Sequence, residues 1–127
     1  MMKKIINTSS APAPIGPYSQ AVETNGMLYV SGQIPIIPET GELCSSSIED
    51  ETAQVMKNLG AILSEAGTSF SKVVKCSIFV KNMGDFAKIN EVYGRSFTDN
   101  PPARETVEVS GLPKGVNVEI SCIAEVG

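Results

Sequence analysis

The sequence predicts a two-layer α+β domain in which two helices pack on one face of a β-sheet. Three observations carry this prediction: a chain of 127 residues with 42% apolar residues, two segments with helical apolar periodicity, and five strand-like segments. Their order along the chain is ββαβαββ, which places both helices on the same side of the sheet. The length is that of one domain, and we expect a single domain over residues 1–127.

The first part of the chain is expected to form an extended arm and a β-hairpin. Residues 8–17 contain three prolines, which remove backbone donors and exclude a helix or a central strand. Strands over 18–24 and 27–34 flank Asn25-Gly26, a pair that favours a two-residue type I′ turn. A loop rich in proline and glycine follows over 35–45.

The clearest element is the helix that comes next. Either Ser46 with Glu49 or Ser47 with Asp50 fits an N-cap arrangement, and Gly67 suits the position after the C-terminus. The apolar residues that share one face of this helix are Val55, Met56, Leu59, Ile62, Leu63 and Ala66.

The second half of the chain is expected to alternate between strands and one more helix. A strand over 73–81 is followed by a helix over 85–97, which Asn100-Pro101-Pro102 ends. Two strands, over 104–110 and 116–126, complete the sheet. The apolar face of the second helix is formed by Phe86, Ile89, Tyr93 and Phe97.

Strand alternation sorts the polar side chains onto one face of the predicted sheet. If Val107 and Val109 point toward the helices, their neighbours point away from them. The helix-free face also carries Tyr29, Phe79 and Ile123, and such a mixed face is typical of burial against another subunit. The polar residues that this sorting assigns to the helix-free face are Ser31, Arg104, Thr106 and Glu119.

The composition excludes several classes of chemistry. The chain has no histidine, which excludes Ser-His-Asp and Cys-His triads, histidine-ligated zinc and an imidazole base. Its only arginines are Arg95 and Arg104, and its net charge is −4. A surface that tracks nucleic-acid phosphates needs clustered positive charge, so the composition argues against a nucleic-acid partner.

The cysteines and the N-terminus bear on the compartment. Cys44, Cys76 and Cys122 are odd in number and include no Cys-x-x-Cys pair, which favours reduced thiols and a cytoplasmic protein over a disulfide scaffold or a metal site. Cys76 and Cys122 lie in apolar segments and are expected in the core, whereas the role of Cys44 stays open. No apolar run is long enough for a signal-peptide core or a membrane span.

Several short motifs resemble the RidA family, also called YjgF or L-PSP, and the resemblance covers essentially the whole chain. The matching residues are 15–21 (Ile-Gly-Pro-Tyr-Ser-Gln-Ala), 31–35 (Ser-Gly-Gln-Ile-Pro), 79–81 (Phe-Val-Lys) with Asp85-Phe86, 102–109 (Pro-Ala-Arg-x-Thr-Val-x-Val), 112–114 (Leu-Pro-Lys), 118–120 (Val-Glu-Ile) and 123–124 (Ile-Ala).

The resemblance implies a chorismate-mutase-like α+β fold with a mixed sheet of about six strands and two helices on one face. It also implies a homotrimer with ligand sites between subunits. The implied activity is the hydrolysis of reactive 2-enamine and 2-imino acids, such as 2-aminoacrylate and 2-iminobutanoate, to 2-keto acids and ammonia. No cofactor and no metal are implied.

The resemblance also assigns roles to residues. It implies that Arg104, Glu119 and Tyr18 are catalytic. The Arg104 guanidinium would hold the substrate carboxylate, a partly buried Glu119 with a raised pKa would activate water, and the Tyr18 hydroxyl would donate a hydrogen bond. Ser96 and Pro101 stand where many relatives have aromatic residues, which leaves the preferred substrate side chain open. The residues implied to bind the substrate are Ser31, Gly32, Asn90 and Thr106.

Two other functions stay open at this point. A metabolite-binding or regulatory module without turnover is the alternative for the same pocket, since both functions need Arg104. Some relatives are described as translation inhibitors or RNA-cleaving proteins. The two arginines, the missing histidine and the lack of a basic aromatic stripe argue against RNA cleavage by this chain.

Overall fold

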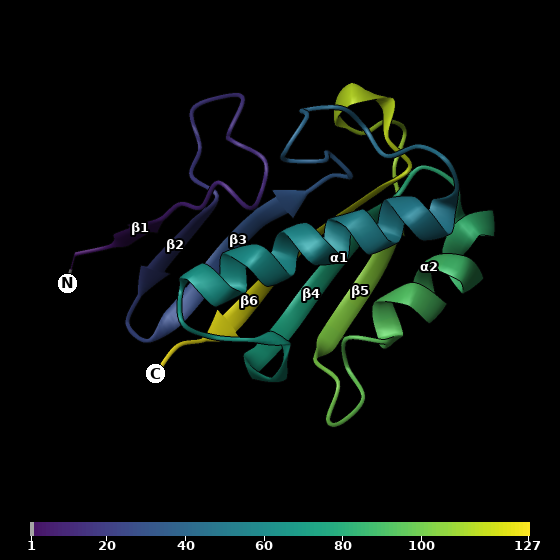
Figure 1. Cartoon of the computed structure of the whole chain (residues 1–127). Helices are drawn as coiled ribbons and strands as arrows, with labels where there is room; N and C mark the ends of the chain where they lie inside the picture. The colour runs from purple at the N-terminus through teal and green to yellow at the C-terminus, as the bar shows by residue number, and fades with distance from the viewer. Residues whose placement is uncertain (1) are drawn as a thin grey trace.

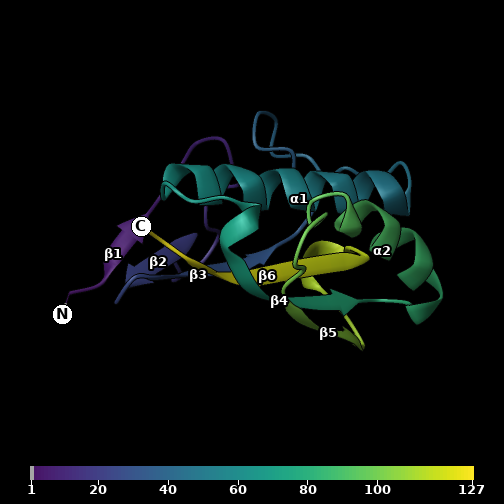
Figure 2. The same cartoon turned by 90° about the horizontal axis from the view of Figure 1, so that it is seen from below.

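The computed structural model describes residues 2–127, and its architecture confirms the predicted α+β class. Both helices lie on one face of a single mixed sheet (Figures 1 and 2). Short 3-10 turns at Phe70–Lys72, Met83–Asp85 and Pro113–Gly115 connect the main elements. Those elements are β1 (Lys4–Ile6), β2 (Ala21–Thr24), β3 (Met27–Gln33), α1 (Ile48–Glu65), β4 (Val73–Val80), α2 (Phe86–Gly94), β5 (Ala103–Glu108) and β6 (Val118–Glu125).

The six strands are arranged in the order β1-β2-β3-β6-β4-β5. Neighbouring strands are antiparallel except for β4 and β5, which are parallel and are joined through α2. Strand β5 is therefore an edge of the sheet, and β6 lies in its interior. This order decides which site residues can meet, because β4 separates β5 from β6.

The turn and cap predictions are confirmed. Asn25 and Gly26 have φ values of 51° and 75°, as a type I′ turn requires. Of the two N-cap alternatives, Ser47 is the cap, and its hydroxyl accepts a hydrogen bond from the Asp50 N–H at 3.0 Å. Gly67, with φ of 79°, ends α1, and the Thr68 N–H donates to the Leu63 carbonyl at 2.9 Å as in a Schellman motif.

Several element boundaries differ from the predictions. Strand β2 begins at Ala21 and not at residue 18, and β5 ends at Glu108 and not at residue 110. Strand β1 was not expected, because three residues are too few to show alternation; it forms where Ile6 pairs with Ala21 and is buried. The predicted helix over 85–97 ends at Gly94, where the chain tightens into turns with Ser96 and Phe97 N–H groups donating three residues back.

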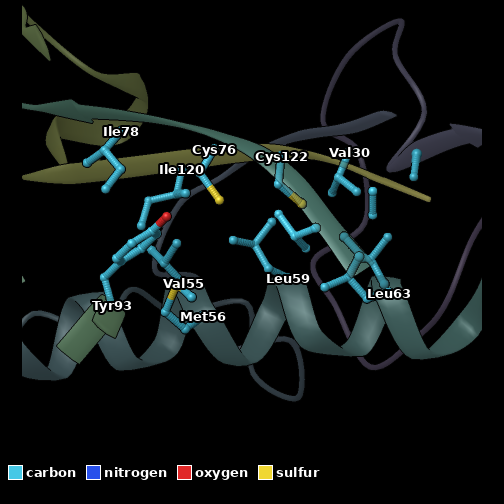
Figure 3. Close-up of a cluster of buried hydrophobic side chains, with 14 of the residues drawn as sticks. Val30, Val55, Met56, Leu59, Leu63, Cys76, Ile78, Tyr93, Ile120 and Cys122 are labelled. Atoms are coloured by element: carbon cyan, nitrogen blue, oxygen red, sulfur yellow. The ribbon is translucent and has the colours of Figure 1, made fainter. Parts of the chain in front are cut away.

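The core lies between α1 and the sheet (Figure 3). Val55, Leu59 and Leu63 of α1 face the strands, where Cys76 and Cys122 are paired across β4 and β6. Both cysteines are free thiols in the core, as expected, and burial raises the pKa of Cys122 to about 12. None of the helices in residues 2–127 is long and apolar enough to cross a membrane.

Candidate functional site

Arg104 and Thr106 lie on the helix side of the sheet, so the prediction that placed both residues on the helix-free face was wrong. In the parallel pairing of β4 and β5, Arg104 is opposite Cys76 and Thr106 is opposite Ile78. Cys76 and Ile78 are buried beneath the helices, and partners in a register share a face. Val107, expected inside, is instead 43% exposed on the helix-free face.

The physical reason is the position of β5 at the sheet edge. The prediction assumed that the apolar set of each strand faces the helices. On an edge strand, an apolar residue such as Val107 can face outward while Arg104 and Thr106 face the helix side. Only the pairing with β4, which no local pattern encodes, fixes the face.

The Arg104 guanidinium is held by one face of helix α2. Its Nη1 donates a hydrogen bond to Asn90 Oδ1 at 2.6 Å. Its Cζ atom lies 5.4 Å from the ring centroid of Phe86 and 5.1 Å from that of Tyr93. Phe86, Asn90 and Tyr93 are spaced i, i+4 and i+7, so they share one helical stripe. We call these three residues and Arg104 the Arg104 group.

The charge of Arg104 is not neutralised by the chain itself. Within residues 2–127 no carboxylate lies within ion-pair distance of its guanidinium. The side chain borders a cavity of about 370 Å³, which is otherwise lined by Tyr93, Pro101 and Pro102. A single guanidinium with free N–H donors, beside one tyrosine and two proline rings, can bind a small anion that carries one carboxylate.

Thr106 follows Arg104 on the same face. Its hydroxyl is shielded from solvent and has no hydrogen-bond partner in the described part of the chain. Buried hydroxyls are normally paired, so this group has an unused hydrogen-bonding capacity two residues from Arg104.

Glu119 lies on the helix-free face, as predicted. It is opposite Phe79 in the pairing of β4 and β6, while its neighbour Ile120 is buried beneath the helices. The carboxylate packs over Gly32, whose missing side chain provides the room. Its oxygens make no hydrogen bond or ion pair with other residues in 2–127, and partial burial raises the pKa of Glu119 above its ordinary value. A desolvated, unpaired carboxylate is suited to accept a proton from water.

Ser31 and Gly32 accompany Glu119, and Tyr18 adjoins them through the backbone. The Ser31 hydroxyl donates to the Ser19 carbonyl at 2.6 Å, and the Ser31 N–H donates to the Gln20 carbonyl at 2.9 Å. The Tyr18 ring is about half exposed, and its hydroxyl accepts a hydrogen bond from the Ile15 N–H at 3.4 Å. We call Ser31, Gly32 and Glu119 the Glu119 group.

The structure therefore separates the predicted site residues into two groups. The Arg104 group is on the helix side of an edge strand, and the Glu119 group is on the opposite face, with β4 between their strands. A ligand with a few heavy atoms cannot touch both groups of one chain through the sheet.

Sequence reasoning also missed three residues that hold the site. It assigned Phe86 and Tyr93 only to the core face of the second helix. Tyr93 is indeed buried in the core, and both rings also contact Arg104. The stripe that they form with Asn90 was a usable signal, since a polar residue interrupts an otherwise apolar face. Gln20 was noted only as part of a motif, yet its amide binds the backbone of the proline arm at four atoms.

Comparisons with known proteins agree with this fold. The family model described as "Endoribonuclease L-PSP" matches residues 8–126. The chain is 52% identical over 123 residues to a RutC family protein of Pyrococcus horikoshii, covering 97% of this chain and 98% of the relative. It is 43% identical over 127 residues to the 2-iminobutanoate/2-iminopropanoate deaminase of Mus musculus, covering 100% and 94%. The crystal structure of E. coli TdcF with bound serine has a TM-score of 0.93 at 41% identity, covering 98% of this chain and 99% of that one.

Proposed function

Because the chain belongs to the L-PSP family, whose members include proteins named RidA, we propose that it hydrolyses small 2-imino acids and their 2-enamine tautomers to 2-keto acids and ammonia. The observation that carries the proposal is the unneutralised Arg104 guanidinium at a cavity lined by Tyr93, Pro101 and Pro102. The fork of an arginine binds a carboxylate through two parallel hydrogen bonds and so orients the neighbouring carbon. That carbon is C2 of the substrate, the atom that water attacks.

The proposed reaction uses Glu119 as its only acid–base group. Glu119 accepts a proton as water adds to C2 of the protonated imine, which gives a carbinolamine. It returns this proton to the nitrogen, the C–N bond breaks, and the electron pair leaves with ammonia. Glu119 takes the hydroxyl proton as the carbonyl forms and passes it to ammonia, which leaves as ammonium. Such imines also hydrolyse without a catalyst in water, so the required rate acceleration is modest. Holding the imine in a fixed orientation beside one base is enough to supply it.

The other predicted residues have supporting roles in this proposal. The Tyr18 hydroxyl donates to the substrate or to the water. Ser31 and Gly32 leave the space that the Glu119 side chain occupies. Thr106 places its unpaired hydroxyl near the substrate carboxylate that Arg104 binds. Asn90 acts on the substrate through Arg104, since its amide oxygen is already occupied by the guanidinium.

We further propose that each site forms between two subunits of a homotrimer. One copy supplies the Arg104 group and its neighbour supplies the Glu119 group, which removes the difficulty that one chain holds them on opposite faces. The exposed apolar residues of the helix-free face support burial against another copy; Tyr29 is 47% exposed and Val107 43%. We place the reaction in the cytoplasm, to which the three free thiols are suited.

Turnover is tested by coupling the protein to a threonine dehydratase that releases 2-aminobut-2-enoate, and by following 2-keto acid formation. We expect the wild-type protein to accelerate keto-acid release, and Arg104→Ala to abolish the effect. Glu119→Gln should bind 2-oxobutanoate and lose turnover. A wild-type protein that binds this keto acid without accelerating release would instead be a metabolite-binding module.

The shared site is tested by mixing the two inactive variants. Arg104→Ala and Glu119→Gln each spoil every site of their own trimer. After unfolding and refolding together in equal amounts, random mixing restores about a quarter of the sites, because the two intact groups then come from different copies. Activity that stays absent in the mixture, although mixed trimers form, would contradict shared sites.

The description of the family model supplies a second candidate, cleavage of RNA. Two arginines and a net charge of −4 provide no basic track for the phosphates. Salt-sensitive RNA cleavage by nuclease-free protein, lost in Arg104→Ala, would favour it over the deaminase.

A further inference from the structure

We propose that the rings of Tyr93 and Phe86 are positioning groups for Arg104. They fix the guanidinium by cation–π contact, so the affinity for a carboxylate depends on these two rings and does not depend on the Tyr93 hydroxyl. The inference rests on the proposed function only in taking Arg104 as the carboxylate anchor. The two rings would then determine the affinity for substrate without contacting C2, the carbon that reacts.

The contacts to Arg104 support a fixed orientation. Distances of 5.1 and 5.4 Å from Cζ to the two ring centroids lie within the usual range for cation–π pairs. The hydrogen bond to Asn90 fixes a third point, at Nη1. An exposed arginine without such contacts would lose much of its rotamer freedom when it binds an anion, and this cost weakens binding. Arg104 is ordered before the anion arrives.

Tyr93 is itself held from behind. Its side chain is only 4% exposed, and its ring centroid lies 4.8 Å from that of Phe97. Phe97 in turn stacks edge-on against Phe70, with 5.5 Å between centroids and an interplanar angle of 88°. The four side chains Phe70, Phe97, Tyr93 and Arg104 therefore form one continuous row of contacts, and Phe97 supports the Tyr93 ring beside Arg104.

The Tyr93 hydroxyl has no comparable role. It is buried in the core, where it faces the Cys76 thiol and has no oxygen or nitrogen partner among the described residues. Figure 3 shows it pointing toward the core side chains of the sheet. Burial raises the pKa of Tyr93, so the hydroxyl stays protonated at neutral pH. Removing it leaves the ring in place, which makes Tyr93→Phe a matched control for Tyr93→Leu.

The experiment measures the dissociation constant for 2-oxobutanoate by calorimetry and the steady-state constants for the imine. We expect Tyr93→Phe to stay within about twofold of the wild-type protein. Tyr93→Leu should weaken binding by about 3- to 30-fold and raise KM by a similar factor, with kcat changed less, since the interaction is made in ground and transition states alike. Phe86→Leu, at a half-buried position that disturbs the core less, should show the same split.

Two further readouts separate positioning from general damage. The Arg104 Nε–Hε resonance, measured without any ligand, should shift in Tyr93→Leu and Phe86→Leu and be retained in Tyr93→Phe. In an Arg104→Ala background, Tyr93→Leu should cause no further loss of 2-oxobutanoate binding. Unchanged affinity and an unchanged resonance in both leucine variants would overturn the inference. If the wild-type protein fails to hydrolyse imines, the binding and resonance series still decide it, so the two failures are distinguishable.

Discussion

The carboxylate of Glu119 lies against the α-carbon of Gly32 on the adjacent strand β3. The two residues meet where the pairing of β3 and β6 shifts register between Val30 and Gln33. A Cβ atom added at Gly32 would lie 2.9 Å from Glu119 Cδ and would overlap its carboxylate oxygen. Glycine at this position is therefore what allows the Glu119 carboxylate to lie here, and no unusual φ angle demands it.

This contact predicts the effect of Gly32→Ala. The methyl group should push the Glu119 carboxylate away from its position while leaving the Arg104 group intact. We expect kcat for imine hydrolysis to fall by about 10²-fold, the cost of misplacing a catalytic group by about 1 Å, with a small change in KM.

Gly111→Ala is the matched control for this change. A Cβ at Gly111 meets no atom within 4 Å, and its φ lies outside the left-handed region. Its kinetic constants should be those of the wild-type protein. Normal kcat in Gly32→Ala would show that Glu119 works from another position or is not the base.

The unpaired Glu119 carboxylate also predicts a pH dependence. Burial raises the pKa of Glu119, and the base must be ionised to accept a proton from water. As the pH falls, kcat/KM should therefore decline with an apparent pKa above about 4.3, the value of a solvated glutamate. A decline that follows an ordinary solvated carboxylate would contradict the assignment.

Glu119→Gln provides the control for stability. A raised pKa means that the folded chain binds the Glu119 proton more tightly than the unfolded chain does, so this residue costs stability as the pH rises through its folded pKa. Above that pKa the wild-type chain buries an ionised carboxylate, and the neutral glutamine of the variant avoids this loss of stability. The variant should unfold at the same denaturant concentration as the wild-type protein or a higher one at pH 7, while lacking activity.

Features that depend on neighbouring residues in the sequence were predicted correctly, whereas features that depend on contacts between distant segments were not. The type I′ turn at Asn25-Gly26 and the end of α1 at Gly67 depend on local backbone geometry, and both were predictable. The face of Arg104 depends on the parallel pairing with β4, which is a tertiary property. The hydrogen bond from Arg104 to Asn90 joins residues 14 positions apart, and the family resemblance implied only that both residues belong to the site.

For the candidate site, the residue types were predictable from the sequence, but their placement on the sheet was not. Family motifs identified Arg104, Glu119 and Ser31 as residue types suited to the chemistry. Alternation then placed them on one face, because it assumes that every strand buries its apolar side. The Val107 side chain breaks that assumption at the sheet edge, and the division into two groups became visible only from the register.

The N-cap of α1 offers a test of local energetics. Ser47→Ala removes the acceptor of the Asp50 N–H, and we expect it to lower the free energy of unfolding by about 1 kcal/mol. Ser46→Ala is the control, since the Ser46 hydroxyl bonds to the exposed Asp50 carboxylate at 2.6 Å and caps no backbone group. Urea denaturation at fixed protein concentration should show a clearly larger loss for Ser47→Ala. Equal losses would contradict Ser47 as the cap.

The proline arm depends on a single buried side chain. Gln20 is 1% exposed; its Oε1 accepts from the Thr8 N–H at 2.8 Å, and its Nε2 donates to the carbonyls of Thr8, Ala11 and Pro12 at 3.0, 3.3 and 2.9 Å. The prolines of residues 8–17 have no N–H groups, so the arm has few backbone donors of its own.

We therefore expect Gln20→Glu to lower the free energy of unfolding by about 2–4 kcal/mol, because a carboxylate of the same shape cannot donate and faces three buried or half-buried carbonyls. Since the arm leads into Tyr18, amide hydrogen exchange at Ile15 and Tyr18 should accelerate more than exchange in α1. Gln54→Glu, at a half-buried position with one amide hydrogen bond to Asn58, is the isosteric control and should cost less. Wild-type exchange rates in the arm of Gln20→Glu would show that the arm is held by other contacts and that Gln20 does not position Tyr18.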